Sequence, residues 1–283
     1  MDGLQGLASY PLPRRSVVMT GLISGFTLAT TRVEAQAIHT DTTGLVAGET
    51  TVRTDKGDLP AYYARPEGAG PFPIVLVIEE IFGVHEYIKD VCRRLAKAGY
   101  LAMAPELYAR LGDLSQMTDV STIVRDVISK APDDQLLRDL DAAVTSAAAI
   151  GGDPKRLGVT GFCRGGRDVW LYAAYNPALR AAVAWYGPVG GTPSGIQPRN
   201  AADVATELKA PLLGLYGGQD AGIPVADVRA AAEKATRAGK TVQLHVFDDA
   251  PHGFHADYRP SYRKADAEAG WREMLAWFGK YLA

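Results

Sequence analysis

The stretch Gly161–Gly166, which reads Gly-Phe-Cys-Arg-Gly-Gly, carries the clearest chemistry of the chain. It follows the short apolar run 157–160 and precedes an apolar segment that stops at Asn176-Pro177, a pair that ends helices. The sequence therefore predicts a strand, a tight turn and a helix. This is the G-x-C-x-G form of a nucleophile elbow, with cysteine where serine is usual. A sulfur held at a helix N-terminus is favoured as a thiolate and can attack a carbonyl carbon.

Two other interpretations of this stretch stay open. A phosphate-binding loop would need G-x-G-x-x-G or a Gly-Lys-Ser/Thr ending, and neither is present. Cys163 could instead be a buried packing residue, which is the usual fate of a lone cysteine. We assign that packing role to Cys92, which lies on the apolar face of a helix predicted from Glu86 to Gly99.

An acid and a histidine also follow predicted strands. Asp220 comes after the strand 211–216, and His252 lies in the loop after the strand 242–247. The order nucleophile, acid, histidine is that of the α/β-hydrolases, and such sheets place their sites at the carboxyl ends of strands. His252 would take the thiol proton and later return it, while Asp220 would orient the imidazole ring. Asp220 could also be a solvated turn residue, and Asp248 or Asp249 would replace it if the strand boundaries differ.

An oxyanion hole needs two fixed backbone N–H groups near the nucleophile. The elbow supplies the N–H of Arg164. We expect the second from Ile81, in the loop that follows the apolar strand 74–78.

Apolar runs of strand length alternate with helical patterns along the chain. Such runs are typical of parallel strands that are covered on both faces. We predict an α/β fold: one domain with a mostly parallel, doubly wound sheet and helices on both faces. The expected strands are 49–53, 59–64, 74–78, 100–104, 157–160, 181–186, 211–216 and 242–247, and the main helices are 86–99, 133–149, 225–238 and 262–281. Residues 111–131 are ambiguous, a loop with helical pieces, and 187–198 is a loop rich in Gly and Pro.

Composition excludes several classes of protein. The 283 residues are 47% hydrophobic with a net charge of -2 and no long run of one sign, so neither nucleic acid nor an anionic membrane surface is an expected partner. Two cysteines cannot form a disulfide framework. His252 and His255 are a weak metal signal, and we predict no metal site. We expect a monomer, although no residue pattern decides the oligomeric state.

The N-terminal residues 1–37 are interpreted as a twin-arginine export signal. Pro13-Arg14-Arg15-Ser16 precedes a modest apolar stretch, and Ala35-Gln36-Ala37 offers a small-x-small cleavage site. The apolar stretch is too short and too polar to span a bilayer. A periplasmic location follows, with a linker at 38–47 and the domain at 48–283. The alternative is an uncleaved extension on a cytoplasmic protein.

Four motifs in order resemble the dienelactone hydrolase (carboxymethylenebutenolidase) family, over about residue 45 to the end. They are Glu79–Val84, Ala104–Arg110, Gly161–Gly165 and Pro251–Phe254. The resemblance implies a single α/β-hydrolase domain that needs no cofactor and opens a cyclic enol-lactone to a keto acid. It also implies that Glu80 contacts the cysteine and helps to deprotonate it when substrate binds.

The same resemblance implies that Arg110 holds the substrate carboxylate, a task that suits a planar guanidinium. The alternative for Arg110 is a plain surface arginine. The family's second carboxylate-binding arginine has Ala256 at its position here; Arg259 and Arg263 are nearby, but no motif places them in the site. Glu79, a second acid before Glu80, is a further departure, as is the export signal. Losing half of a carboxylate clamp weakens the case for an anionic lactone more than the case for hydrolysis.

We therefore predict a cysteine-dependent hydrolase that cleaves a small lactone or ester through an acyl-thioester intermediate. Phe82, Trp185 and Tyr186 are expected as pocket walls, with plain core residues as the alternative. The other hypotheses are a broad-specificity carboxylesterase of the same fold, a non-catalytic binder, and a redox sensor that uses Cys163.

Overall fold

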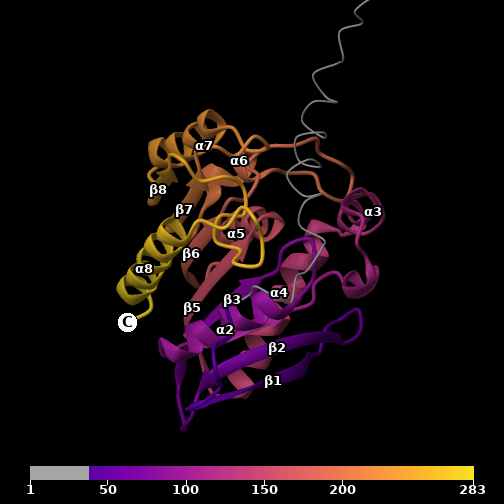
Figure 1. Cartoon of the computed structure of the whole chain (residues 1–283), viewed down its shortest axis with the longest axis vertical. Helices are drawn as coiled ribbons and strands as arrows, with labels where there is room; N and C mark the ends of the chain where they lie inside the picture. The colour runs from indigo at the N-terminus through magenta and orange to yellow at the C-terminus, as the bar shows by residue number, and fades with distance from the viewer. Residues whose placement is uncertain (1–37) are drawn as a thin grey trace, which may run out of the picture.

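The computed structural model describes residues 38–283, and the export signal predicted for 1–37 lies outside the described residues. An eight-stranded sheet forms the centre of the molecule, in the order β1-β2-β4-β3-β5-β6-β7-β8 (Figure 1). β2 pairs antiparallel with β1 and β4, and every other neighbouring pair is parallel. The strands are β1 Leu45–Val52, β2 Leu59–Pro66, β3 Phe72–Ile78, β4 Leu101–Pro105, β5 Gly152–Phe162, β6 Leu179–Trp185, β7 Leu212–Gly217 and β8 Val242–Phe247.

Helices cover both faces of this sheet, so the predicted fold class is confirmed. They are α2 Glu86–Lys97, α3 Val120–Asp126, α4 Asp133–Ala149, α5 Arg164–Tyr175, α6 Ala201–Val204, α7 Val225–Arg237 and α8 Lys264–Tyr281. One core cluster joins α2 and α8 to the sheet and holds Cys92 and Phe278. The other joins α4, α5 and α7 to the opposite face and holds Leu140, Trp170 and Val228. Cys92 is fully buried, as predicted for a packing residue.

The middle of the sheet is buried on both faces, which explains the continuous apolar runs of its strands. In β3 the run Ile74–Ile78 has no exposed residue, because the helices of both layers lie against it. The segment 111–131 has the helical pieces that the sequence suggested, namely α3 and short 3₁₀ turns at Leu114–Gln116 and Ile128–Lys130. Residues 187–200 run without helix or strand before α6 begins at Ala201.

The stretch 38–47, predicted as a linker, is in contact with the domain. β1 already begins at Leu45. Before it, the Thr40 N–H donates to Asp90 of α2, and Lys97 donates to Asp41 at 2.9 Å. Within residues 38–283, no helix is long and apolar enough to cross a membrane.

Candidate active site

Cys163 sits at a strained turn between β5 and α5. Its backbone has φ 55° and ψ -119°, and only one other non-glycine residue of 38–283, Tyr186 with φ 37°, has a positive φ. A Cβ on Gly161 would lie 2.4 Å from the carbonyl oxygen of Gly165, and one on Gly165 would lie 2.5 Å from that of Ile78. Real Cβ atoms do not come this close to backbone, so the strand and helix can only approach because both positions are glycine. The geometry is that of a nucleophile elbow.

The two backbone groups expected to form an oxyanion hole belong to the start of α5 and to the loop after β3. Arg164 is the first residue of α5, where backbone N–H groups have no intrahelical acceptor. Ile81 lies in the loop after β3, and Gly165 packs directly against the start of that loop, 2.5 Å from the Glu79 carbonyl oxygen for an added Cβ. Cys163 itself is 5% exposed, and its N–H donates to the carbonyl of Trp185 at 3.1 Å.

Asp220 and His252 are joined by a hydrogen bond. His252 Nδ1 lies 2.6 Å from Asp220 Oδ2, and the other carboxylate oxygen accepts from the Gly222 N–H at 2.9 Å. The two loops are tied together, because the Gln219 N–H donates to the Ala250 carbonyl at 2.9 Å. An acceptor at Nδ1 assigns the ring proton to that nitrogen and leaves Nε2 as the basic one.

Cys163 and His252 interact directly. Burial by itself would lower the pKa of His252, but the Cys163 sulfur and the Asp220 carboxylate outweigh it and raise that pKa to about 10. The imidazolium is thus favoured beside the sulfur. This is the arrangement that a nucleophilic cysteine and its base would need.

Glu80 lies in a second buried group, behind the elbow. Its carboxylate accepts from Arg259 Nη2 at 3.0 Å and from the Tyr258 hydroxyl at 2.5 Å, and His85 Nε2 is 3.5 Å away. Burial alone would raise the pKa of Glu80, but the charge of Arg259 and its other partners lower it to about 2. The contact with the Cys163 sulfur on substrate binding, which the family resemblance implied for Glu80, stays a prediction.

Two of the three residues expected as pocket walls, Tyr186 and Phe82, lie against His252 and Arg259, and their role as walls stays a prediction. The Tyr186 ring stands edge-on to the His252 ring at 5.2 Å, and the Phe82 ring lies 5.1 Å from the guanidinium carbon of Arg259. Trp185 is fully buried and packs on His255 at 4.5 Å between ring centroids. It belongs to the core, which was the alternative for this residue.

Arg110 is not brought to this group. Its guanidinium donates to both Asp139 oxygens, at 2.7 and 3.1 Å, and to the carbonyls of Lys56 and Gly57. It also donates to the hydroxyl of Thr54. These contacts tie the β1–β2 turn to α4, as a structural arginine would.

Arg259 is the arginine that the sequence reasoning did not place. Ala256, at the position of the family's second arginine, is fully buried, whereas Arg259 reaches Glu80 with 4% of its surface exposed. The tight turns Ala256 N–H to Gly253 O and Arg259 N–H to Ala256 O bring it back toward the elbow. In the sequence, only the turn-forming composition of residues 256–263 indicated that the chain bends back here. Composition alone does not say which side chain the bend brings to the site.

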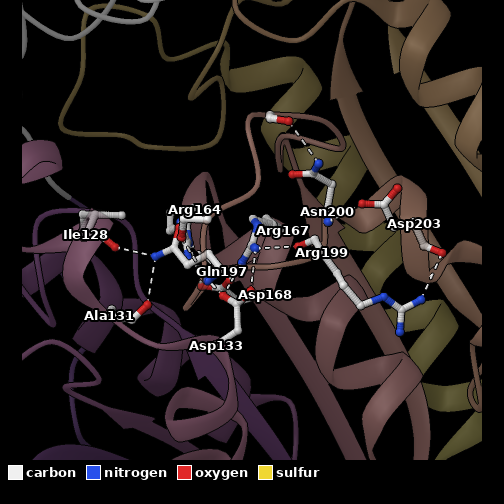
Figure 2. A network of polar contacts seen from close by, with 12 residues as sticks. Ile128, Ala131, Asp133, Arg164, Arg167, Asp168, Gln197, Arg199, Asn200 and Asp203 are labelled. Atoms are coloured by element: carbon white, nitrogen blue, oxygen red, sulfur yellow. Dashed lines mark hydrogen bonds and ion pairs between the residues drawn. The ribbon is translucent and has the colours of Figure 1, made fainter.

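A polar network holds Arg164, the residue that follows Cys163 (Figure 2). The Arg164 side chain contacts Asp168 one helical turn on, and Arg167 donates to both oxygens of Asp133 at the start of α4, at 2.9 and 2.8 Å. Gln197 donates to the carbonyls of Ile128 and Ala131 at 2.7 and 2.8 Å. It also accepts from Arg164 Nη1 at 3.3 Å. The unpatterned segments 111–131 and 187–200 are therefore anchored at the N-terminus of α5.

One group within 38–283 has the spacing of metal ligands: His39, Glu86 and Asp90. Arg93 already pairs with both acids, at 3.0 Å for Asp90. This group lies on α2 and the segment before β1, apart from the elbow.

Comparisons with known proteins agree with this geometry. Residues 59–282 match the model of the Dienelactone hydrolase family. A Methylorubrum extorquens protein named "Putative carboxymethylenebutenolidase" is 55% identical over 97% of this chain and 95% of its own, and one of the same name from Salmonella typhimurium is 49% identical over 91% and 96%. A solved structure titled as a putative dienelactone hydrolase from Klebsiella pneumoniae superposes with a TM-score of 0.82, at 51% identity, over 84% of this chain and 99% of the other.

Proposed function

Because the chain belongs to the dienelactone hydrolase family and is a hydrolase of ester or lactone bonds, we propose that Cys163 is its nucleophile and that the reaction passes through an acyl-thioester. The observation that carries the proposal is the 2.6 Å bond between Asp220 and His252, with the ring in contact with the elbow cysteine. Three side chains from three separate loops meet in the order and roles of a nucleophile, base and orienting acid.

The proposed reaction has two halves. The Cys163 thiolate attacks the carbonyl carbon while His252 holds the proton at Nε2, and the N–H groups of Ile81 and Arg164 stabilise the oxyanion. The intermediate collapses to the thioester, and the departing alkoxide takes the proton from His252. Water then attacks the thioester with His252 as base, the thiolate leaves, and the carboxylic acid is released.

Glu80 acts first as the partner of Arg259 in this proposal. With its pKa lowered to about 2, the carboxylate is a poor base while it faces the guanidinium. The role that the family resemblance gives it, deprotonation of Cys163, requires that substrate draw Arg259 away. A carboxylate on the substrate would do so by replacing Glu80 at Arg259.

A second candidate is a broad carboxylesterase that takes neutral esters. The observation in its favour is that both candidate carboxylate-binding arginines are already paired with acids, Arg110 with Asp139 and Arg259 with Glu80. The role of Arg110 as a substrate clamp stays a prediction, and it requires the 2.7 Å pair with Asp139 to break.

The deciding experiment compares hydrolysis of a dienelactone with that of a neutral aryl ester, for the wild type and Cys163→Ala. Faster cleavage of the lactone, lost in the variant, supports the specific proposal. Cleavage of the ester alone, still lost in the variant, supports the carboxylesterase. If the variant retains the wild-type rate on either substrate, Cys163 is not the nucleophile.

We also propose that residues 1–37 are an export signal, on the strength of Arg14-Arg15 and the Ala35–Ala37 site. The N-terminal sequence of the protein purified from intact cells tests this. A start after Ala37 supports export, and a start at Met1 contradicts it.

A further inference from the structure

A small cavity lies on the other side of the loop that carries Glu80 and Ile81. It has a volume of about 110 Å³ and is lined by Glu79 and residues 82–85 of this loop and by Glu106, Tyr108 and Asp113 among others. Phe82 lines it too, and the same ring lies 5.1 Å from the Arg259 guanidinium. His85 also lines it, and its Nε2 lies 3.5 Å from Glu80 Oε2, so the cavity borders the Glu80–Arg259 pair.

Glu79 is the unusual residue of this cavity. Its side chain is fully buried, and Oε1 accepts from the Leu107 N–H at 2.7 Å. Oε2 has no hydrogen-bond partner among residues 38–283 and lies 3.8 Å from where a Cβ on Gly83 would stand, at the cavity wall. Burying a polar atom without a partner is unfavourable, so such an atom at a cavity points to a partner atom outside residues 38–283, from a water or a ligand.

The protonation of Glu79 decides what that ligand atom must be. Burial, and next the charge of Glu106, raise the pKa of Glu79 well above its usual value, with Asp168 adding to the effect. The neutral acid keeps its carbonyl oxygen toward the Leu107 N–H, so the proton sits on Oε2. Glu79 then offers the cavity a donor, in the manner of a buried carboxylic acid held neutral at pH 7.

Other polar side chains at the cavity are the hydroxyls of Tyr108 and Ser115 and the ring of His85, whose two nitrogens have no hydrogen-bond partner among residues 38–283. The lining holds the carboxylates of Glu106 and Asp113, and no Lys or Arg occurs among the described residues that line it. An anion would be repelled, and an apolar group would leave Glu79 unsatisfied. An ammonium group only donates, and the acids here do not have the mutual spacing of metal ligands. A hydroxyl group both accepts from Glu79 and donates to a carboxylate.

We propose that this cavity is a subsite for a hydroxyl-bearing part of the substrate, and that Glu79 donates a hydrogen bond to the substrate hydroxyl. Its volume is that of about three or four water molecules, which suits a short polyol fragment rather than a sugar ring. The proposal rests on the proposed ester or lactone hydrolysis and specifies its substrate class: neutral esters or lactones that carry free hydroxyls.

Two esters of one acid test the subsite, glycerol 1-monobutyrate and propyl butyrate, which differ in two hydroxyls. The wild type is expected to give a kcat/KM about tenfold higher for the glycerol ester, since a net hydrogen bond is worth about 0.5–1.5 kcal/mol. Glu79→Leu should reduce that ratio to about one, and Glu79→Gln should keep it within about threefold, because the amide still donates. Glu233→Leu, at an exposed carboxylate of α7 paired with Arg237, is the matched control and should leave the ratio unchanged.

A second readout needs no turnover. The infrared carbonyl stretch of a protonated carboxylic acid should be present in the wild type, absent in Glu79→Gln, and shifted by added glycerol but not by propanol. The proposal would be overturned if the wild type showed a kcat/KM ratio near one for the two esters and glycerol did not shift the carbonyl band. The cavity would then hold water only. Equal loss on both esters in Glu79→Leu would instead assign Glu79 a purely structural role. If no ester is cleaved at all, the proposed function fails, while the glycerol-induced band shift still decides the subsite.

Discussion

Arg259 Nη2 lies 3.0 Å from Glu80 Oε1, in an ion pair whose two side chains are 3% and 0% exposed. The pair stands between the loop after β3 and the turns after His252, and it brings a guanidinium close enough to Cys163 for their charges to interact. It is therefore a clamp between two loops that also holds a guanidinium near the sulfur.

Removing one member of this pair should be costly. Arg259→Met leaves the Glu80 carboxylate buried without its counter-ion, and we expect a loss of about 3–5 kcal/mol in the free energy of unfolding. Glu80→Gln combined with Arg259→Met leaves no uncompensated charge and should recover part of that loss. Urea unfolding of the three proteins measures it. A single variant as stable as the wild type would mean that the pair is solvated.

The acid that orients His252 can be tested by a change of one atom. Asp220→Asn keeps the size of the side chain but removes the charge and turns the ring toward the wrong tautomer, so kcat should fall by about 10³–10⁴-fold. Asp249→Asn, at an exposed acid three residues before His252, is the control and should change kcat by less than about threefold. If Asp249→Asn lowered kcat as much as Asp220→Asn does, the orienting acid would lie in the 248–249 turn.

Stability should depend on pH through His252. Its pKa is raised from 6.5 to about 10, so the stabilisation that it gains from Cys163 and Asp220 is fully present below about pH 6.5. This stabilisation is lost progressively as the pH rises to about 10. We expect the free energy of unfolding to fall over this range, and to fall much less in Cys163→Ala, which lacks the sulfur. Urea midpoints at pH 6.5, 8 and 10 measure both slopes. Parallel slopes would show that Cys163 is not the partner that raises this pKa.

The fold was readable because burial on both faces leaves continuous apolar runs such as 74–78, and because Gly99 and Pro177 end helices by local chemistry. The ends of strands were harder to predict. For example, β5 begins at Gly152, five residues before the apolar run 157–160 from which this strand was predicted. The prediction also missed the start of β1 at Leu45, because an edge strand with one exposed face alternates weakly.

The site residues also fall into those that the sequence could predict and those that it could not. Cys163, Asp220 and His252 follow the carboxyl ends of strands, which parallel pairing must bring to one edge, so their meeting could be predicted. Arg259 and Gln197 reach the site through turns, and no periodicity or spacing foretells where a turn points. Arg110 is in a motif, yet Asp139, which lies in α4 and 29 residues further along the chain, determines where its guanidinium lies.

That placement of Arg110 makes a prediction of its own. Arg110→Met removes a two-pronged bond to Asp139, which is 1% exposed, and should lower the free energy of unfolding by about 1–3 kcal/mol. Because the arginine holds the β1–β2 turn and not the substrate in this arrangement, kcat/KM for an anionic lactone and for a neutral ester should change by the same factor. A loss confined to the anionic substrate would restore Arg110 as a carboxylate clamp.

Backbone strain at the nucleophile gives a test that is independent of turnover. A side chain at φ 55° and ψ -119° is disfavoured, whereas glycine accepts that region freely. Cys163→Gly should therefore be more stable than Cys163→Ala by about 1–2 kcal/mol, although both lose the sulfur and its contact with His252. Ala173→Gly, at a buried position in the last turn of α5, is the opposite control and should destabilise the protein by about 1 kcal/mol. If Cys163→Gly proves no more stable than Cys163→Ala, the elbow is relaxed, and the exposure of the sulfur has to be explained by the glycines at 161 and 165 alone.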